Sequence, residues 1–163
     1  MGADDDDHPD TQKFLKLLES FRFSDRYYAY CAAHAAEGPD LPTAAQTTAL
    51  AETGRTFRHN KKEKFFAWRD ANAPADCELG LNVSLEHGQV EWILVFKTPS
   101  GHLGRPFPAL ALQTKRLSTP AYRHTPPTPV PNVSDPSSLG DALDQGLALY
   151  DELAGALAAQ TWR

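Results

Sequence analysis

The chain has 163 residues, of which 41% are hydrophobic and 23% charged, and its formal net charge is -5. This length and balance are typical of one folded domain that buries its own core, and they exclude a disordered chain or a scaffold that depends on disulfides. The negative charge disfavours nucleic acid and anionic membranes as partners, unless the cations gather on one face.

Residues 1–9, MGADDDDHP, are predicted to form an acidic flexible tail. The four aspartates at positions 4–7 repel one another and bury nothing, so no folded structure is expected there. A weak cation site that combines these aspartates with His8 is the alternative, but adjacent residues in a flexible tail do not pre-form a coordination sphere.

The sequence has no pattern of a secretion signal or a membrane span. Its N-terminus is acidic and polar, whereas a signal peptide is basic and then apolar. The longest apolar run covers only residues 92–96, far fewer than a membrane span needs. We therefore expect a cytoplasmic protein with no membrane partner.

Two helices are expected after the tail. The first begins with Asp10 as N-cap and carries one apolar face, made of Phe14, Leu15, Leu17, Leu18 and Phe21. The second covers residues 24–36, with Ser24 as its cap and the Gly38-Pro39 pair beyond its end.

A third helix is indicated by its two ends. Thr43 and Gln46 have the spacing of a capping box, in which each side chain bonds to the backbone of the other. Gly54 suits the position just after a helix C-terminus.

The following segments have the period of β structure. The aromatic FFAW at 65–68 is strand-prone. Residues 77–85 alternate strictly between apolar and polar, as expected for a strand with one buried and one solvent-facing side. His87 and Gly88 predict a tight turn, after which QVEWILVFK returns as a strand near the centre of the sheet.

The two cysteines, Cys31 and Cys77, are expected to be buried free thiols. Cys31 lies in the second helix and Cys77 at the start of the alternating run. A domain of this size does not need a disulfide for its stability.

The C-terminal third begins with a turn-rich connection at 98–106. A short helix is expected at 107–117, with Pro106 or Pro108 in its first turn, and a strand is the alternative. Six prolines between residues 118 and 138 predict an extended surface segment or an edge strand. The last helix starts in Ser-Asp-Pro-Ser-Ser and has an apolar stripe, made of Leu139, Leu143, Leu147, Tyr150, Leu153 and Leu157.

Together these elements predict an α+β fold in which residues 10–163 form a single domain. An antiparallel β meander of about four to five strands follows the N-terminal helices, and a C-terminal helix packs on the sheet. The helices are expected to cover one face of that sheet.

No motif for metal, phosphate or nucleophilic chemistry is present. The six histidines lack the spacing of a helical metal pair, and there is no C-x-x-C, H-E-x-x-H or G-x-S-x-G. The loop at 101–105 has two glycines, but not the third glycine of G-x-G-x-x-G or the Lys-Ser/Thr of a P-loop. We therefore expect no metal, no cofactor and no catalytic residues. An enzyme would have to combine distant residues such as His102, Arg105 and Glu91.

A basic stretch between residues 55 and 64 is interleaved with aromatic side chains. Its cations are Arg55, Arg58, His59, Lys61, Lys62 and Lys64. Such a stretch can bind single-stranded nucleic acid by charge and stacking, or it can be an edge strand that lysines protect from aggregation. It can also bind an acidic protein surface, whereas nucleic acid is an unfavourable partner for a chain that is acidic overall.

Six residues are candidates for contacts with a protein partner. His102 and Arg105 lie on the loop at 101–105, between two ordered segments that can present them rigidly. The other four are Arg58, Lys61 and Lys62 in the basic stretch and Glu86 at the predicted hairpin turn.

The order of these segments resembles the small bacterial immunity-type proteins that accompany polymorphic or contact-delivered toxins. The likeness covers about residues 56–157, with FFAW, then ELGLNVSLEHGQVEWILVFKTPSGHLGRPFPALA (78–111), then GLALYDEL (146–153). Its most specific part is the G-x-x-G-x-P-F-x-x-L-A run at 101–111.

The resemblance implies a non-catalytic inhibitor that occludes or distorts a cognate toxin through complementary charge and buried aromatic anchors. It transfers neither catalytic nor contact residues, and it does not include the acidic tail. An adaptor or secretion-type chaperone that binds a client segment is the alternative, and an enzyme with a site assembled from distant residues is a third. The oligomeric state stays open.

Overall fold

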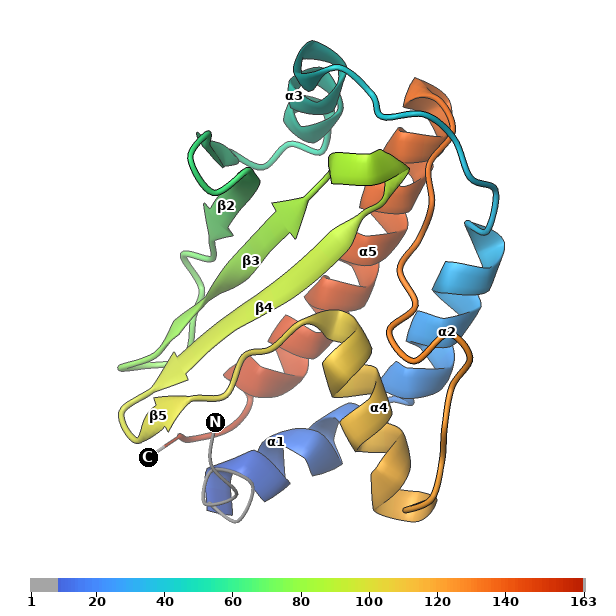
Figure 1. Cartoon of the computed structure of the whole chain (residues 1–163). Helices are drawn as coiled ribbons and strands as arrows, with labels where there is room; N and C mark the ends of the chain where they lie inside the picture. Colours follow the sequence, from blue (N-terminus) through green and yellow to red (C-terminus); the bar gives the residue numbers. More distant parts are fainter. Residues whose placement is uncertain (1–8, 163) are drawn as a thin grey trace.

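The computed structural model describes residues 9–162, so the predicted acidic tail lies outside the described residues except for Pro9, which begins the first helix. Figure 1 shows how the elements of this part of the chain are arranged. In chain order they are α1 (Pro9–Ser20), α2 (Phe23–Ala33), α3 (Thr43–Glu52), β1 (Arg58–Asn60), β2 (Phe65–Arg69), β3 (Glu78–Ser84), β4 (Glu91–Thr98), β5 (Gly101–His102), α4 (Phe107–Ser118) and α5 (Pro136–Ala158).

The strands form one antiparallel sheet in the order β1-β2-β3-β4-β5, so that each strand pairs with its neighbours in sequence. This meander, with helices before and after it, confirms the predicted α+β class and the C-terminal helix. The strand predicted near the centre, β4, lies beside the middle strand β3 and has partners on both sides.

The alternation along β3 buries one face of the sheet, as predicted. Leu79, Leu81 and Val83 on this inner face are at most 1% exposed. They pair with Phe96, Leu94 and Trp92 of β4, which are fully buried. Burial of six large apolar side chains in two adjacent strands is the main hydrophobic contribution of the sheet to the core.

Trp92 joins the inner face to three helices. Its indole Nε1 donates a hydrogen bond to the Tyr30 hydroxyl of α2 (3.1 Å), which in turn donates to the Ala142 carbonyl of α5 (2.6 Å). The ring stacks at 6.2 Å on Phe107 of α4. In Figure 1, α5 runs behind the sheet and no described helix crosses the front of β3 and β4.

Two predicted helix starts are wrong, because each capping side chain has a distant partner instead. Asp10 lies inside the first turn of α1 and accepts a hydrogen bond from Ser100 Oγ (3.0 Å). Ser24 is the second residue of α2, and its buried hydroxyl donates to the Ala111 carbonyl of α4 (2.5 Å). The N-cap of α2 is Arg22, and the helix ends at Ala33, three residues before the predicted end at 36.

The predicted capping box of α3 is also wrong. The N-cap is Pro42, which makes no side-chain cap, and Gln46 Nε2 donates to the carbonyls of Leu41 (3.0 Å) and Leu85 (3.1 Å). Gln46 therefore ties α3 to the end of β3. Gly54 follows the helix with a φ of 81°, in the left-handed region predicted for it.

The segment between α4 and α5 contains no helix and only one bridge residue, Asn132, and its buried residues Pro129, Pro131 and Val133 show that it is not the surface segment that the prolines predicted. It forms a strap across α2 and the β3–β4 turn. Pro129 accepts a hydrogen bond from the Tyr27 hydroxyl (2.6 Å), and Val133 N donates to the Gly88 carbonyl (2.8 Å). The turn itself is a 3-10 turn at Glu86–Gly88, longer than the tight turn predicted from His87 and Gly88. The helix predicted at 107–117 is confirmed as α4.

Both cysteines are free thiols, and they differ in exposure. Cys31 is buried against the strap, with its Sγ 3.7 Å from the Pro129 carbonyl, whereas Cys77 is only half-buried. Burial raises the pKa of Cys31 to about 11, although its hydrogen bond with Tyr27 acts in the opposite direction. Cys31 is therefore both inaccessible and protonated at neutral pH.

We expect an aromatic disulfide reagent at about pH 8 to label Cys77 in the native protein and Cys31 only after unfolding, because the thiolate is the reactive form. Mass spectrometry of labelled peptides measures the two rates. The variant Cys77→Ser is the control and should show no rapid labelling. Equal native rates at the two cysteines would contradict the burial of Cys31.

Two glycines of α5 provide a matched test of the packing on Trp92. A Cβ on Gly146 would lie 2.3 Å from Trp92 Nε1, whereas a Cβ on Gly140 would meet nothing within 4 Å. Gly146→Ala should lower the free energy of unfolding by about 1–3 kcal/mol through overpacking, while Gly140→Ala should raise it by up to about 1 kcal/mol through helix propensity. Urea unfolding of both variants measures this difference, and equal effects would contradict the contact.

Candidate protein-binding groove

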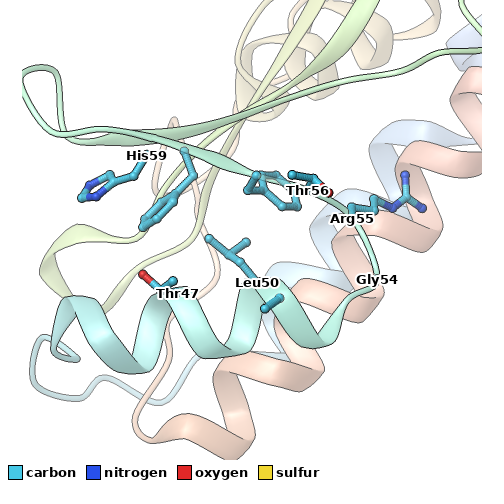
Figure 2. A pocket seen from close by; sticks show the side chains of 9 residues that line it. Thr47, Leu50, Gly54, Arg55, Thr56 and His59 are labelled. Carbon is cyan, nitrogen blue, oxygen red and sulfur yellow. The ribbon is translucent and has the colours of Figure 1, made fainter.

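A groove of about 350 Å³ lies between α3 and the hairpin formed by β1 and β2. Its lining residues are Thr47, Leu50 and Ala51 of α3, Gly54, Arg55, Thr56 and Phe57 of the connection, and His59 and Phe66 of the hairpin. Figure 2 shows Thr47 and Leu50 pointing from the helix toward the strand that carries His59. The groove is therefore open at the β1 edge of the sheet.

The floor of the groove is apolar and aromatic. Leu50 and Phe66 belong to the core, and Phe57 is half-buried against it. The His59 imidazole stacks on the Phe66 ring with centroids 4.3 Å apart and planes at 13°. A floor of this kind suits an apolar side chain of a partner, because burying aromatic surface contributes strongly to binding.

Arg55 clamps the back of the groove to α5. Its Nη2 donates to both carboxylate oxygens of Asp151, at 2.7 Å each, and its guanidinium lies 4.7 Å from the centre of the Trp68 ring. Figure 2 shows the side chain pointing away from the groove toward α5. Arg55 therefore shapes the groove, and its charge is already matched by a carboxylate.

A second polar contact anchors the same region. The Tyr150 hydroxyl of α5 donates to Asp70 Oδ2 just after β2 (2.8 Å). Burial and this hydrogen bond to Asp70 raise the pKa of Tyr150, so its hydroxyl stays a donor at all ordinary pH values. The ring meets Trp68 edge to face at 5.3 Å.

The hairpin that forms the outer wall carries the cations predicted from the basic stretch. We call Arg58, Lys61, Lys62 and Lys64 the basic edge; all four are exposed. Lys64 has a carboxylate partner in Glu86, 3.7 Å away. Within residues 9–162, no carboxylate lies within 4.0 Å of the charged groups of Arg58, Lys61 or Lys62.

Local geometry places the lysines at the tip of the hairpin. The Asn60 side chain accepts a hydrogen bond from Glu63 N (3.1 Å), and the Asn60 carbonyl accepts one from Lys64 N (2.8 Å). Lys64 has a φ of 60°, the left-handed conformation that closes the turn. These bonds hold Lys61 and Lys62 outward in the solvent.

The six residues predicted to contact a partner fall into two separate groups. Arg58, Lys61, Lys62 and Glu86 lie near the end of the sheet where the β1–β2 and β3–β4 turns meet. His102 and Arg105 lie on the far side of β4, in and after β5. The structure does not bring the two groups together.

The loop at 101–105 presents only one of its two predicted contacts. His102 pairs with Lys97 and is exposed, whereas Arg105 is buried, and its carbonyl accepts a hydrogen bond from Leu94 N (3.0 Å). Partial burial and the nearby Lys97 lower the pKa of His102, so the imidazole is neutral at pH 7.

The residues considered for an enzyme do not meet. Glu91 and His102 face opposite ends of β4, since Glu91 pairs with Ser84 and Lys97 pairs with His102. Six residues along a strand span about 20 Å. Among the described residues, no three His, Cys, Asp or Glu side chains gather as ligands for a metal ion.

The α3 side of the groove was missed by sequence reasoning. Thr47 and Leu50 carry no chemical signal of their own, and only the packing of α3 against the hairpin makes them part of a concave surface. A weak indication was present, because Leu50 is a large apolar residue in an otherwise small and polar helix.

Comparison with models of protein families, with curated proteins and with solved structures found no match to this chain in any of the three. In the part of the chain that the structure describes, no helix is long and apolar enough to cross a bilayer.

The clamp predicts that Arg55 and Arg58 respond differently to the same substitution. Arg55→Lys should lower the free energy of unfolding by about 1 kcal/mol, because an ammonium has no flat surface to lie on the Trp68 ring as the guanidinium does. Arg58→Lys on the exposed edge should change it by less than about 0.5 kcal/mol. Urea unfolding measures both, and equal losses would contradict the clamp.

Proposed function

We propose that this chain is a non-catalytic protein-binding domain that acts as an immunity-type inhibitor and neutralises a cognate toxin. In this proposal the groove and the basic edge form the contact surface, and the partner presents an acidic surface to them. The resemblance of residues 56–157 to immunity-type proteins motivates the class of partner.

One observation carries the choice of surface. The groove has an apolar floor, and Lys61 and Lys62 at the tip of the hairpin beside it are exposed without a carboxylate partner in residues 9–162, as is Arg58 on the opposite face of the hairpin, on a chain whose formal net charge is -5. Some other basic side chains of the fold pair with acids, among them Arg26 with Glu152 and Lys115 with Asp25. Unmatched cations around an apolar depression suit an acidic protein partner.

The basic edge and the groove contribute to binding in different ways. The cations steer an acidic partner to the surface, and this long-range attraction weakens as salt screens it. An apolar side chain of the partner, placed over Phe57 and Phe66, supplies the desolvated centre of the contact. The clamp at Arg55 keeps the floor rigid, so little ordering is needed on binding.

The experiment measures binding of the purified chain to the protein products of neighbouring genes by titration calorimetry. Lys61→Glu with Lys62→Glu should weaken binding to the cognate partner at least about tenfold. Lys16→Glu with Arg123→Glu carries the same charge change on exposed residues away from the hairpin, and it should alter binding less than about twofold.

Salt provides a second readout of the same surface. The affinity of the unaltered chain should fall several-fold between about 50 and about 500 mM NaCl, and that of the Lys61/Lys62 variant should change much less. Equal affinities for the two double variants would place the contact elsewhere. Failure to bind any neighbouring protein, together with measurable turnover by the chain, would overturn the proposed class.

The adaptor or chaperone alternative has one supporting observation. β1 is an edge strand with a free side next to the groove, and an extended client segment can pair with such an edge. A chaperone should bind an unfolded peptide of its client as tightly as the whole client, whereas an inhibitor should require the folded toxin.

A further inference from the structure

β1 forms one edge of the sheet, and part of its main chain is directed away from the sheet. It pairs with β2 alone. In an antiparallel pair, residues alternate between those whose N–H and C=O groups bond to the neighbouring strand and those whose groups point away from it. The Asn60 carbonyl accepts a hydrogen bond from Lys64 N in the turn that leads to β2 (2.8 Å), so the main chain of Asn60 is directed toward β2. The alternation therefore directs the N–H and C=O groups of His59 to the open side of β1.

The hydrogen bonds on the other side of β2 give the same assignment. Asp70 N donates to the Leu79 carbonyl of β3 (2.8 Å), so alternate residues of β2, counted back from Asp70, bond to β3. Phe66 is one of these residues, and its partner on β1 is His59. Because the main chain of Phe66 faces β3, that of His59 has no partner in β2. Within residues 9–162, no loop backbone or side chain bonds to it either.

The side chain of His59 lines the groove next to these open main-chain groups. Phe57, two residues earlier, lines the same groove, and Thr47 and Ala51 of α3 line it from the other side and are exposed. Figure 2 shows Thr47 pointing toward the strand that carries His59. Side chains at opposite positions of paired strands lie on the same face of a sheet. A residue that pairs with His59 from outside therefore places its side chain in the groove, where the apolar floor favours an apolar residue.

Arg58 lies on the opposite face of the same strand. Its partner on β2 is Ala67, and its side chain points to the face away from His59. The Arg58 guanidinium is exposed, with no carboxylate within 4.0 Å in residues 9–162. An acidic residue directly across from it on an added strand forms a favourable cross-strand pair. Lys61 and Lys62 continue this positive charge at the tip of the hairpin.

We propose that the partner pairs with β1 as a sixth strand, through a short extended segment in which apolar and acidic residues alternate. This inference rests on the proposed function, because it names the part of the toxin that occupies the groove and the basic edge. The apolar residues enter the groove beside Phe57 and His59, and the acidic residue between them faces Arg58. On a folded toxin the segment is an exposed edge strand.

The short length of β1 makes the side-chain pattern decisive. β1 has three residues, and among them His59 directs its main chain outward, so a generic strand forms few hydrogen bonds with this edge. In this mode of binding the main-chain bonds contribute affinity, and pockets for alternate side chains provide specificity. Two apolar or two acidic residues in succession place one of them on the wrong face, because strand side chains alternate with a period of two.

Two variants of His59 separate the main-chain bond from the imidazole. His59→Ala and His59→Pro both lack the ring, and only His59→Pro lacks the N–H group. Proline is tolerated on an edge strand where the N–H faces solvent, so both variants should fold, which circular dichroism checks. In titration calorimetry with the partner found among the neighbouring gene products, His59→Pro should bind at least about fivefold more weakly than His59→Ala.

Hydrogen exchange measured by NMR reports the same bond in the unaltered chain. The His59 amide should exchange at least about tenfold more slowly in the complex than in the free chain, because a paired amide exchanges only after local opening. The Arg58 amide is the internal control. It faces β2 with and without the partner, so its exchange should change less.

Two capped synthetic peptides test the pattern without the toxin. VEVEV and VVVEE have the same composition and charge, and only the first alternates. At peptide concentrations up to about 2 mM, a range chosen for a short segment that loses its freedom on binding, VEVEV should shift the His59 amide resonance in a saturable way. VVVEE should shift it much less.

The strand pairing and the proposed function fail in different ways. Equal binding by the two His59 variants with an unprotected His59 amide would overturn the pairing, and so would a VEVEV peptide that shifts the amide no more than VVVEE does. If Lys61→Glu with Lys62→Glu weakens binding while His59→Pro matches His59→Ala, the contact surface holds and the sixth strand is wrong. If the Lys61/Lys62 variant binds the partner as the unaltered chain does, the proposed contact surface itself is wrong.

Discussion

The burial of Trp92 is the interaction on which the structure depends. Its indole fills the space between the sheet and the helix layer, contacts Phe107 of α4, and has a hydrogen-bond partner in Tyr30 of α2. A buried indole N–H without a partner would cost free energy, so the position of α2 is tied to that of β4. Gly146 completes the arrangement, because only a residue without a side chain lets α5 approach the ring.

This arrangement gathers the helices on one face of the sheet and leaves the β1 edge accessible beside the groove. The edge is covered only partly, since α3 is a ten-residue helix whose buried residues are Ala49 and Leu50. The groove lies where this short helix stops covering the hairpin. The groove is thus a consequence of the short length of α3, which covers only part of the core at this edge.

The elements with a strong period were predictable from the sequence, and the contacts between distant segments were not. β3 and α5 follow their apolar patterns closely, because one face of each is buried along its whole length. Asp10 and Ser24 have the residue types of helix caps, yet their partners, Ser100 and Ala111, are about 90 residues away. No local pattern indicates such partners.

For the candidate surface, too, the charged residues were predictable from the sequence, but their positions relative to one another were not. The basic stretch was predictable from residue types alone, because the charge of a side chain can be read from the sequence without knowledge of the fold. The separation of His102 from Lys61 depends on the strand order, and the contribution of Leu50 depends on how α3 packs. Arg105 was predicted as a surface contact because it lies on a loop between two ordered segments, and its burial beside β4 follows only from the pairing of residues 101–105 with that strand.

The one-sided helix layer divides the residues of β3 and β4 into two independent sets. The positions that face the helices hold the core, and the opposite set is exposed or half-buried except for Gly80 and Val95, which are buried. A lineage with this fold can therefore exchange the outward-facing residues of its central strands, apart from Gly80 and Val95, and acquire new specificity at a small cost in stability.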